Sequence, residues 1–132
     1  MKTLMLAAAA LVLITALKAS MIYAGESVDV KELKKIMSDG GFAGSQAAVL
    51  DVREDDEFKE GHIKGAVHIP LGEISRRFAE LKKIKKLYVI CYSGARSSSA
   101  CKIISKLCPE ITAVNVSDGM SGWYGSGFEI KK

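Results

Sequence analysis

The sequence predicts an α/β domain with a central, mainly parallel sheet and helices on both faces. Two observations support this fold class: short apolar runs alternate with segments of helical periodicity, and an apolar run such as 47–52 is almost unbroken. Nearly unbroken apolar strands are typical of a sheet that is covered on both faces. Alternating strands and helices are typical of parallel sheets. The chain has 132 residues, of which 48% are hydrophobic and 26% charged, which suits one globular domain.

The first 24 residues are predicted to be a signal peptide that precedes the domain. Lys2 provides a positive start, an apolar run covers residues 4–17, and Ala24 stands before Gly25 as a candidate cleavage position. This order is typical of secretory signals. The run is shorter than the ~20 apolar residues of a membrane span, and an uncleaved anchor facing the periplasm is the alternative. We therefore expect residues 25–132 to form an exported domain.

The first half of this domain is predicted to contain two helices and two strands. A capping pattern at residues 29–32 begins a helix that ends at a pair of glycines. The apolar run 47–52 predicts a buried strand, and an acidic helical turn follows at 55–60. A second strand is predicted at 65–69, and Pro70 ends it.

The second half continues the alternation. Apolar residues at helical spacing predict a helix over 74–81, and a lysine-rich turn leads from it to a strand at 87–90. A helix is predicted over 97–107 because its apolar residues form one stripe and Pro109 follows. The last clear strand is predicted at 111–116.

The chemistry is predicted where the strand 87–90 ends. Cys91 follows this strand at the carboxyl edge of the sheet, where open α/β folds bind ligands. The loop after it consists of Tyr92, Ser93, Gly94, Ala95, Arg96 and Ser97. Its small residues allow successive backbone N–H groups to face one centre, and the helix N-terminus reinforces this anion-binding nest. Such donors stabilise a thiolate, the form of cysteine that acts as a nucleophile, and Arg96 adds a positive charge.

Four segments in order resemble the single-domain rhodaneses, a family of sulfurtransferases. They are residues 50–54, residues 61–70, the pattern Cys-x-x-Gly-x-Arg at 91–96, and residues 118–123. The resemblance extends over residues 28–130 and implies the rhodanese-like fold; the exported form resembles small periplasmic rhodaneses of bacteria. One departure is Asp118, since many members of the family carry a glycine there.

The resemblance implies a double-displacement reaction. The Cys91 thiolate would take a sulfane sulfur from thiosulfate or a similar donor and pass it, as a persulfide, to cyanide or a thiol. Residues 92–97 would bind the donor, with Arg96 orienting its sulfonate end. Asp51 and Arg53 are expected to support the site structurally. No metal and no organic cofactor are implied.

Alternative functions remain open from the sequence. A phosphatase or arsenate reductase could share the topology, although phosphatase loops are one residue longer than the four residues between Cys91 and Arg96 here. A non-catalytic sulfur-relay or binding module, working with another exported sulfur carrier or redox protein, is the other alternative.

Charge and cysteine usage exclude further classes. The net charge of +4 is dispersed apart from one lysine-rich turn, so nucleic-acid binding is not expected. The three cysteines form no Cys-x-x-Cys pair, which argues against a zinc ribbon and a thioredoxin-type dithiol. Cys101 and Cys108 lie too far apart along one predicted helix for a disulfide. His62 and His68 are expected to make fixed hydrogen bonds.

Overall fold

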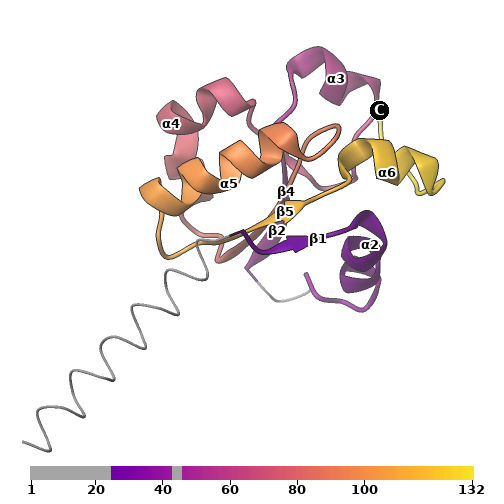
Figure 1. Ribbon diagram of the computed structural model, residues 1–132, viewed down its shortest axis with the longest axis horizontal. Coiled ribbons are helices and arrows are strands. Elements are labelled where there is room, and N and C mark those ends of the chain that lie inside the picture. Colours follow the sequence, from indigo (N-terminus) through magenta and orange to yellow (C-terminus); the bar gives the residue numbers. More distant parts are fainter. Residues whose placement is uncertain (1–24, 43–45) are drawn as a thin grey trace, which may run out of the picture.

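The computed structural model describes residues 25–42 and 46–132 (Figure 1). The predicted signal peptide, residues 1–24, therefore lies outside the described residues. Within the described ranges, no helix has the length and apolar character needed to cross a membrane.

A five-stranded parallel sheet forms the centre of the domain, with the strand order β1-β5-β4-β2-β3. The strands are β1 (Ser27–Val28), β2 (Ala47–Asp51), β3 (Val67–His68), β4 (Lys86–Ile90) and β5 (Thr112–Val116). In the register of β2 and β4, Asp51 pairs with Ile90, the residue before Cys91. The polar end of β2 therefore lies beside the predicted site.

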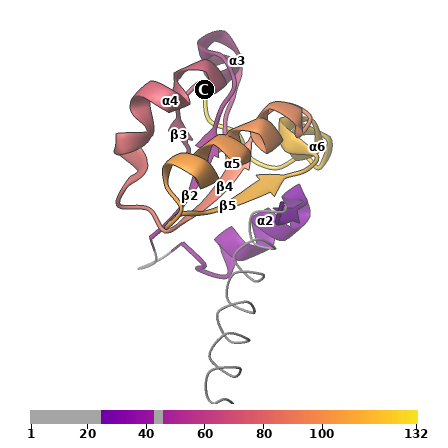
Figure 2. The same cartoon turned by 60° about the vertical axis from the view of Figure 1, so that its left-hand side comes forward.

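Helices cover both faces of the sheet (Figures 1 and 2). They are α2 (Val30–Ser38), α3 (Asp55–Glu60), α4 (Ile74–Arg77), α5 (Ala95–Leu107) and α6 (Gly119–Gly125), with 3₁₀ turns at Leu71–Glu73 and Phe78–Leu81 on either side of α4. One apolar cluster joins α4 and α5 to the sheet, and a second cluster joins α2 and α6 to the opposite face. This arrangement confirms the predicted α/β class with its central parallel sheet.

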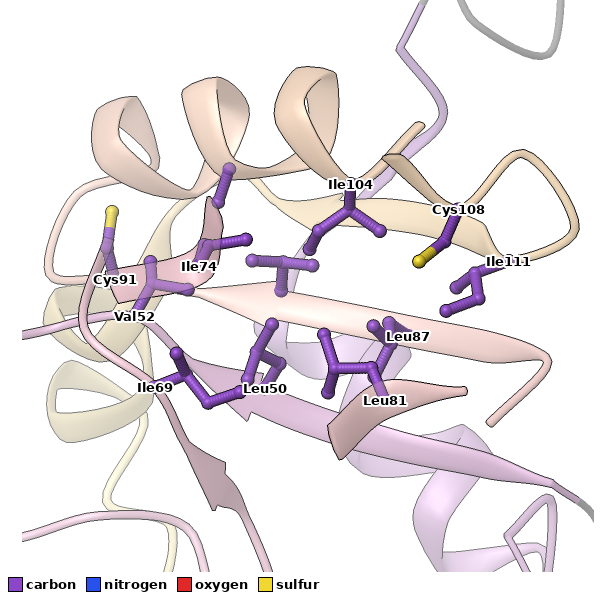
Figure 3. Packing of buried hydrophobic residues seen from close by; sticks show 12 residues of the cluster. Leu50, Val52, Ile69, Ile74, Leu81, Leu87, Cys91, Ile104, Cys108 and Ile111 are labelled. Carbon is purple, nitrogen blue, oxygen red and sulfur yellow. The ribbon is translucent and has the colours of Figure 1, made fainter. Parts of the chain in front are cut away.

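Alternation along β4 determines where Cys91 points. Leu87 and Val89 belong to the cluster under α5, whereas Tyr88 and Ile90 belong to the cluster under α2 and α6. Cys91 continues the first set by the two-residue period of a strand. Figure 3 shows it at one end of that cluster, with its sulfur on the side of the helix α5.

The helix and strand boundaries differ most from the predicted ones in two places. The predicted helix over 74–81 is a single α-helical turn between 3₁₀ turns, and the strand predicted at 65–69 is only Val67–His68. Two elements were not predicted. The two-residue β1 is too short to show a period, and the glycine-rich α6 has low helix propensity and is stabilised by burial of Met120 and Trp123.

Candidate active site

Cys91 lies between the end of β4 and the start of α5. The residue is 1% exposed, and polar groups surround its sulfur. The backbone N–H of Gly94 donates to Sγ at 3.1 Å, and the hydroxyl of the fully buried Ser97 lies 3.3 Å from Sγ. The sulfur atom is therefore enclosed by hydrogen-bonding groups at the edge of an apolar core.

Gly94 allows the loop to close over the sulfur. It is the N-cap of α5 and has φ +95°, and a Cβ at this position would collide with the Ser117 carbonyl. Residues with side chains rarely adopt this conformation. The tight turn makes α5 begin at Ala95, two residues earlier than the sequence predicts, and places Ser97 in the first helical turn.

The first turn of α6 supports the loop from outside. The backbone N–H groups of Met120 and Ser121 donate to the carbonyls of Cys91 and Tyr92 at 2.8 and 2.9 Å. Gly119, with φ +58°, makes this approach possible, because a Cβ there would collide with both carbonyl groups. Because the carbonyls of Cys91 and Tyr92 face α6, the N–H groups of the loop are free to face the sulfur. Sequence reasoning missed this support.

Asp118, the departure from the family pattern, has a defined structural contact. Its carboxylate accepts the backbone N–H of Val30 at 2.9 Å. Asp29 accepts the N–H of Glu32 at 2.8 Å, as the capping pattern predicts. Both carboxylates thus satisfy N–H groups at the start of α2, which have no partner within the helix.

The local environment lowers the pKa of Cys91. Burial by itself raises this pKa, but the hydrogen bond with the Ser97 hydroxyl and the backbone N–H groups of Ser97, Gly94 and Ser93 together outweigh burial. The pKa values of the other two thiols shift in the opposite direction. Burial raises the pKa of Cys101 to about 12, and it also raises the pKa of Cys108. Of the three cysteines, Cys91 is the one whose thiolate the fold stabilises.

Arg96 is paired with a carboxylate that the sequence analysis did not single out. Its Nη1 and Nη2 donate to Oε1 and Oε2 of Glu57 on α3 at 2.6 and 3.0 Å. This hydrogen bonding lowers the pKa of Glu57. The two residues are 39 positions apart, and their side chains are about one-third exposed. No local spacing signal connects them, so only the tertiary structure reveals the pair.

Asp51 and Arg53 form a buried ion pair beside the site. Arg53 Nη2 and Nε donate to Asp51 at 2.8 and 3.0 Å, and the two residues are 2% and 0% exposed respectively. Arg53 also donates to the carbonyls of Gly61 and Glu57 at 2.8 and 3.3 Å. It thereby ties the end of α3, and the backbone of Glu57, to the end of β2.

Both histidines make the fixed hydrogen bonds that the sequence predicts. His62 Nδ1 donates to the carbonyl of Phe58 at 2.8 Å, and His68 Nε2 donates to that of Arg53 at 2.7 Å. The Phe58 ring stacks between the two imidazoles, with centroid distances of 3.7 and 4.2 Å. These contacts hold α3 in place next to the site.

The structure brings part of the predicted loop around the sulfur and leaves part at the rim. The residues around the sulfur are Cys91, Ser93, Gly94 and Ser97. Tyr92 is 50% exposed, and Ala95 is exposed at the start of α5. Among the described residues, no group of three or more His, Cys, Asp or Glu side chains could hold a metal ion.

Comparisons with known proteins show what this chain is similar to. Residues 29–126 match the family model of the rhodanese-like domain. The chain is 44% identical over 77 residues to "Putative sulfur carrier protein YrkF" of Bacillus subtilis, covering 58% of this chain and 41% of that protein. It is 41% identical over 83 residues to "Putative sulfurtransferase YtwF" of the same organism, covering 63% and 79% respectively. The chain thus spans about two fifths of the length of the first relative.

A solved structure supports the same fold. The crystal structure of a rhodanese-related protein from Thermoplasma volcanium superposes with a TM-score of 0.69 at 29% identity. The match covers 80% of this chain and 97% of that chain.

Proposed function

Because the chain belongs to the family of rhodanese-like domains, we propose that it moves a sulfane sulfur from thiosulfate or a similar donor to a thiol or cyanide acceptor through a persulfide on Cys91. The observation that carries this proposal is the sulfur environment. Sγ of Cys91 accepts the N–H of Gly94 and lies against the Ser97 hydroxyl, and these contacts lower the pKa of Cys91. A stabilised thiolate is the nucleophile that covalent sulfur transfer requires.

In the first step, the Cys91 thiolate attacks the outer sulfur of the donor. A new S–S bond forms to Sγ, and the bond between the two donor sulfur atoms breaks. The bonding electron pair leaves with the sulfite released from thiosulfate, and the enzyme keeps a persulfide anion. N–H groups that already face the sulfur stabilise negative charge there without reorganising.

In the second step, a nucleophilic acceptor attacks the outer sulfur of the persulfide. Cyanide becomes thiocyanate, or a thiolate becomes a persulfide, and the Cys91 thiolate is regenerated with its original charge. The second step needs no proton from His62 or His68, because the leaving group is the thiolate that the loop stabilises. Both imidazoles are committed to backbone carbonyls.

We also propose that residues 1–24 direct export and are then removed. The sequence order of a basic start, an apolar run and Ala24 before Gly25 supports this. Amino-terminal sequencing of protein from the periplasm should begin near Gly25. Membrane-bound protein that begins at Met1 would instead establish the anchor.

The sulfurtransferase proposal is tested by intact mass after incubation with thiosulfate and removal of excess donor. The wild-type chain should gain one sulfur atom and lose it again when cyanide is added. Cys91→Ser should gain none and form no thiocyanate. Cys101→Ser and Cys108→Ser are matched controls that should keep most of the activity. Sulfur uptake by Cys91→Ser at the wild-type level would refute the assignment.

A further inference from the structure

The carboxylate of Glu57 is held in place from several directions. Both of its oxygens accept Arg96, and Oε1 also accepts the backbone N–H of Glu54 at 3.2 Å. The backbone carbonyl of Glu57 accepts Arg53, which is itself fixed by the buried Asp51. The ion pair with Arg96 is therefore part of a built structure that links α3 to the first turn of α5.

This pairing changes the electrostatics of the site. Arg96 is the cation of the loop, and one N–H on each of its terminal nitrogens is committed to Glu57. This positive charge lies within electrostatic range of Cys91, and the Glu57 carboxylate thus offsets it there. Glu54 adds a further carboxylate within electrostatic range of Arg96. These carboxylates therefore repel an anionic donor that approaches the loop, while the guanidinium attracts it.

The repulsion depends on the charge of the donor. Coulomb energy is proportional to the product of the two charges, so Glu57 repels a dianion about twice as strongly, in free energy, as a monoanion at the same position. Arg96 attracts the dianion more strongly in the same proportion, and Glu57 offsets this advantage. Thiosulfate carries two negative charges. An organic thiosulfonate or a persulfide of a neutral thiol carries one, and it can deliver a sulfane sulfur to a thiolate in the same way.

We propose that Glu57 is a specificity-determining residue that offsets the attraction of Arg96 for dianionic sulfur donors and so shifts the preference of the loop toward singly charged donors of the thiosulfonate or persulfide class. The inference rests on the proposed sulfur transfer and names the donor class for it. Glu57→Gln is the appropriate variant, because glutamine serves at the same position of a capping box. The variant removes the charge while the hydrogen bond to the N–H of Glu54 can persist.

Donor binding can be measured separately from turnover in the Cys91→Ser background. Thiosulfate and methanethiosulfonate form a matched pair of donors that differ by one charge. Their dissociation constants follow from titrations of the backbone amide signals of residues 93–97 by NMR. Adding Glu57→Gln should tighten methanethiosulfonate binding about threefold and thiosulfate binding about ninefold, the scale of one or two screened charge interactions over a few ångströms.

Asp56→Asn is the matched control, since Asp56 is an exposed carboxylate on the same helix. Asp56→Asn should change the ratio of the two dissociation constants by a smaller factor, at most about half of the change that Glu57→Gln causes. The reason is that exposed charges farther from the ligand are screened. An unchanged or reversed ratio in Glu57→Gln would overturn the inference, as would an equal effect of Asp56→Asn. Failure of the wild-type chain to take up sulfur would refute the proposed function, but the binding ratio would still decide the role of Glu57.

Discussion

The Ser97 hydroxyl and the Cys91 sulfur lie 3.3 Å apart, and the two residues are 0% and 1% exposed. Ser97 stands in the first turn of α5, whereas Gly94 is the N-cap of that helix. The Ser97 hydroxyl therefore faces the sulfur and does not cap the helix. A buried hydroxyl directed at a buried thiol favours the thiolate, because the hydroxyl can donate to the negative charge.

The first prediction concerns the pH dependence of sulfur uptake. The wild-type rate should rise with pH and level off below the ordinary thiol pKa of 9.0, because the pKa of Cys91 is lowered. Ser97→Ala removes a hydrogen bond to a charged group, which is worth roughly 1.5–3 kcal/mol. The inflection should therefore move to higher pH, and uptake at neutral pH should fall about tenfold or more. Stopped-flow measurement of persulfide formation across pH checks this.

Ser99→Ala is the control for this change, since Ser99 is an exposed residue of the same helix. Its profile should coincide with that of the wild-type chain. If Ser97→Ala lowers the plateau rate but leaves the inflection where it was, Ser97 does not stabilise the thiolate.

The second prediction concerns selective labelling of the thiols. Cys101 is more exposed than Cys91, yet burial raises the pKa of Cys101 to about 12, whereas the pKa of Cys91 is lowered. Because the thiolate is the reactive form, iodoacetamide at neutral pH should modify Cys91 at least about tenfold faster than Cys101. Peptide mass mapping over time measures both rates. In denaturant the two rates should converge, and equal rates in the folded protein would contradict the prediction.

The sequence could predict the parts of this fold and site that depend on local patterns. The apolar run 47–52, the capping residue Asp29 and the position of Cys91 after the strand 87–90 each carry a signal within a few residues. The partnership of Glu57 with Arg96 carries none, because the two residues meet only after α3 and α5 have packed at the same edge of the sheet.

The support of the loop by α6 could not be predicted from the sequence for a different reason. Gly119 in the sequence indicates only a turn, and a helix with several glycines has no strong propensity signal. The contacts that matter are backbone N–H groups on backbone carbonyls, which have no residue-specific signature. The structure was needed to show that this turn holds the loop of Cys91.

The third prediction tests that support. Gly119→Ala introduces a Cβ that collides with the carbonyls of Cys91 and Tyr92 at a positive φ. It should lower the free energy of unfolding by about 1–3 kcal/mol and also lower sulfur uptake. Gly125→Ala is the control, since no atom lies within 4 Å of the added Cβ. Urea denaturation of both variants measures the difference; a wild-type midpoint and activity for Gly119→Ala would show that the loop tolerates the displacement.

The fourth prediction uses the ion pair of Arg96 and Glu57. Arg96→Ala removes a charged hydrogen-bond donor and leaves the Glu57 carboxylate without its cation, so the KM for thiosulfate should rise about tenfold or more. The double change Arg96→Ala with Glu57→Gln should recover part of this loss. Arg76→Ala, which breaks an exposed pair with Glu73 on α4, should leave KM unchanged. A double variant as impaired as Arg96→Ala would mean that the unpaired carboxylate does not repel the donor.

The last prediction separates sulfur transfer from phosphate chemistry. Four residues separate Cys91 from Arg96, and the closed loop already places the Gly94 N–H at 3.1 Å and the Ser97 hydroxyl at 3.3 Å from the sulfur. These donors can enclose one added sulfur atom, whereas the oxygens of a phosphoryl group need more N–H groups at a greater radius. We therefore expect thiocyanate formation from thiosulfate and cyanide, but no hydrolysis of p-nitrophenyl phosphate above a Cys91→Ser blank. Inserting one glycine between the exposed Tyr92 and Ser93 should widen the loop and lower sulfur transfer, because the donors would no longer converge on Sγ. A wild-type chain that hydrolyses the phosphate ester through Cys91 faster than it forms thiocyanate would show that loop length does not set the selectivity.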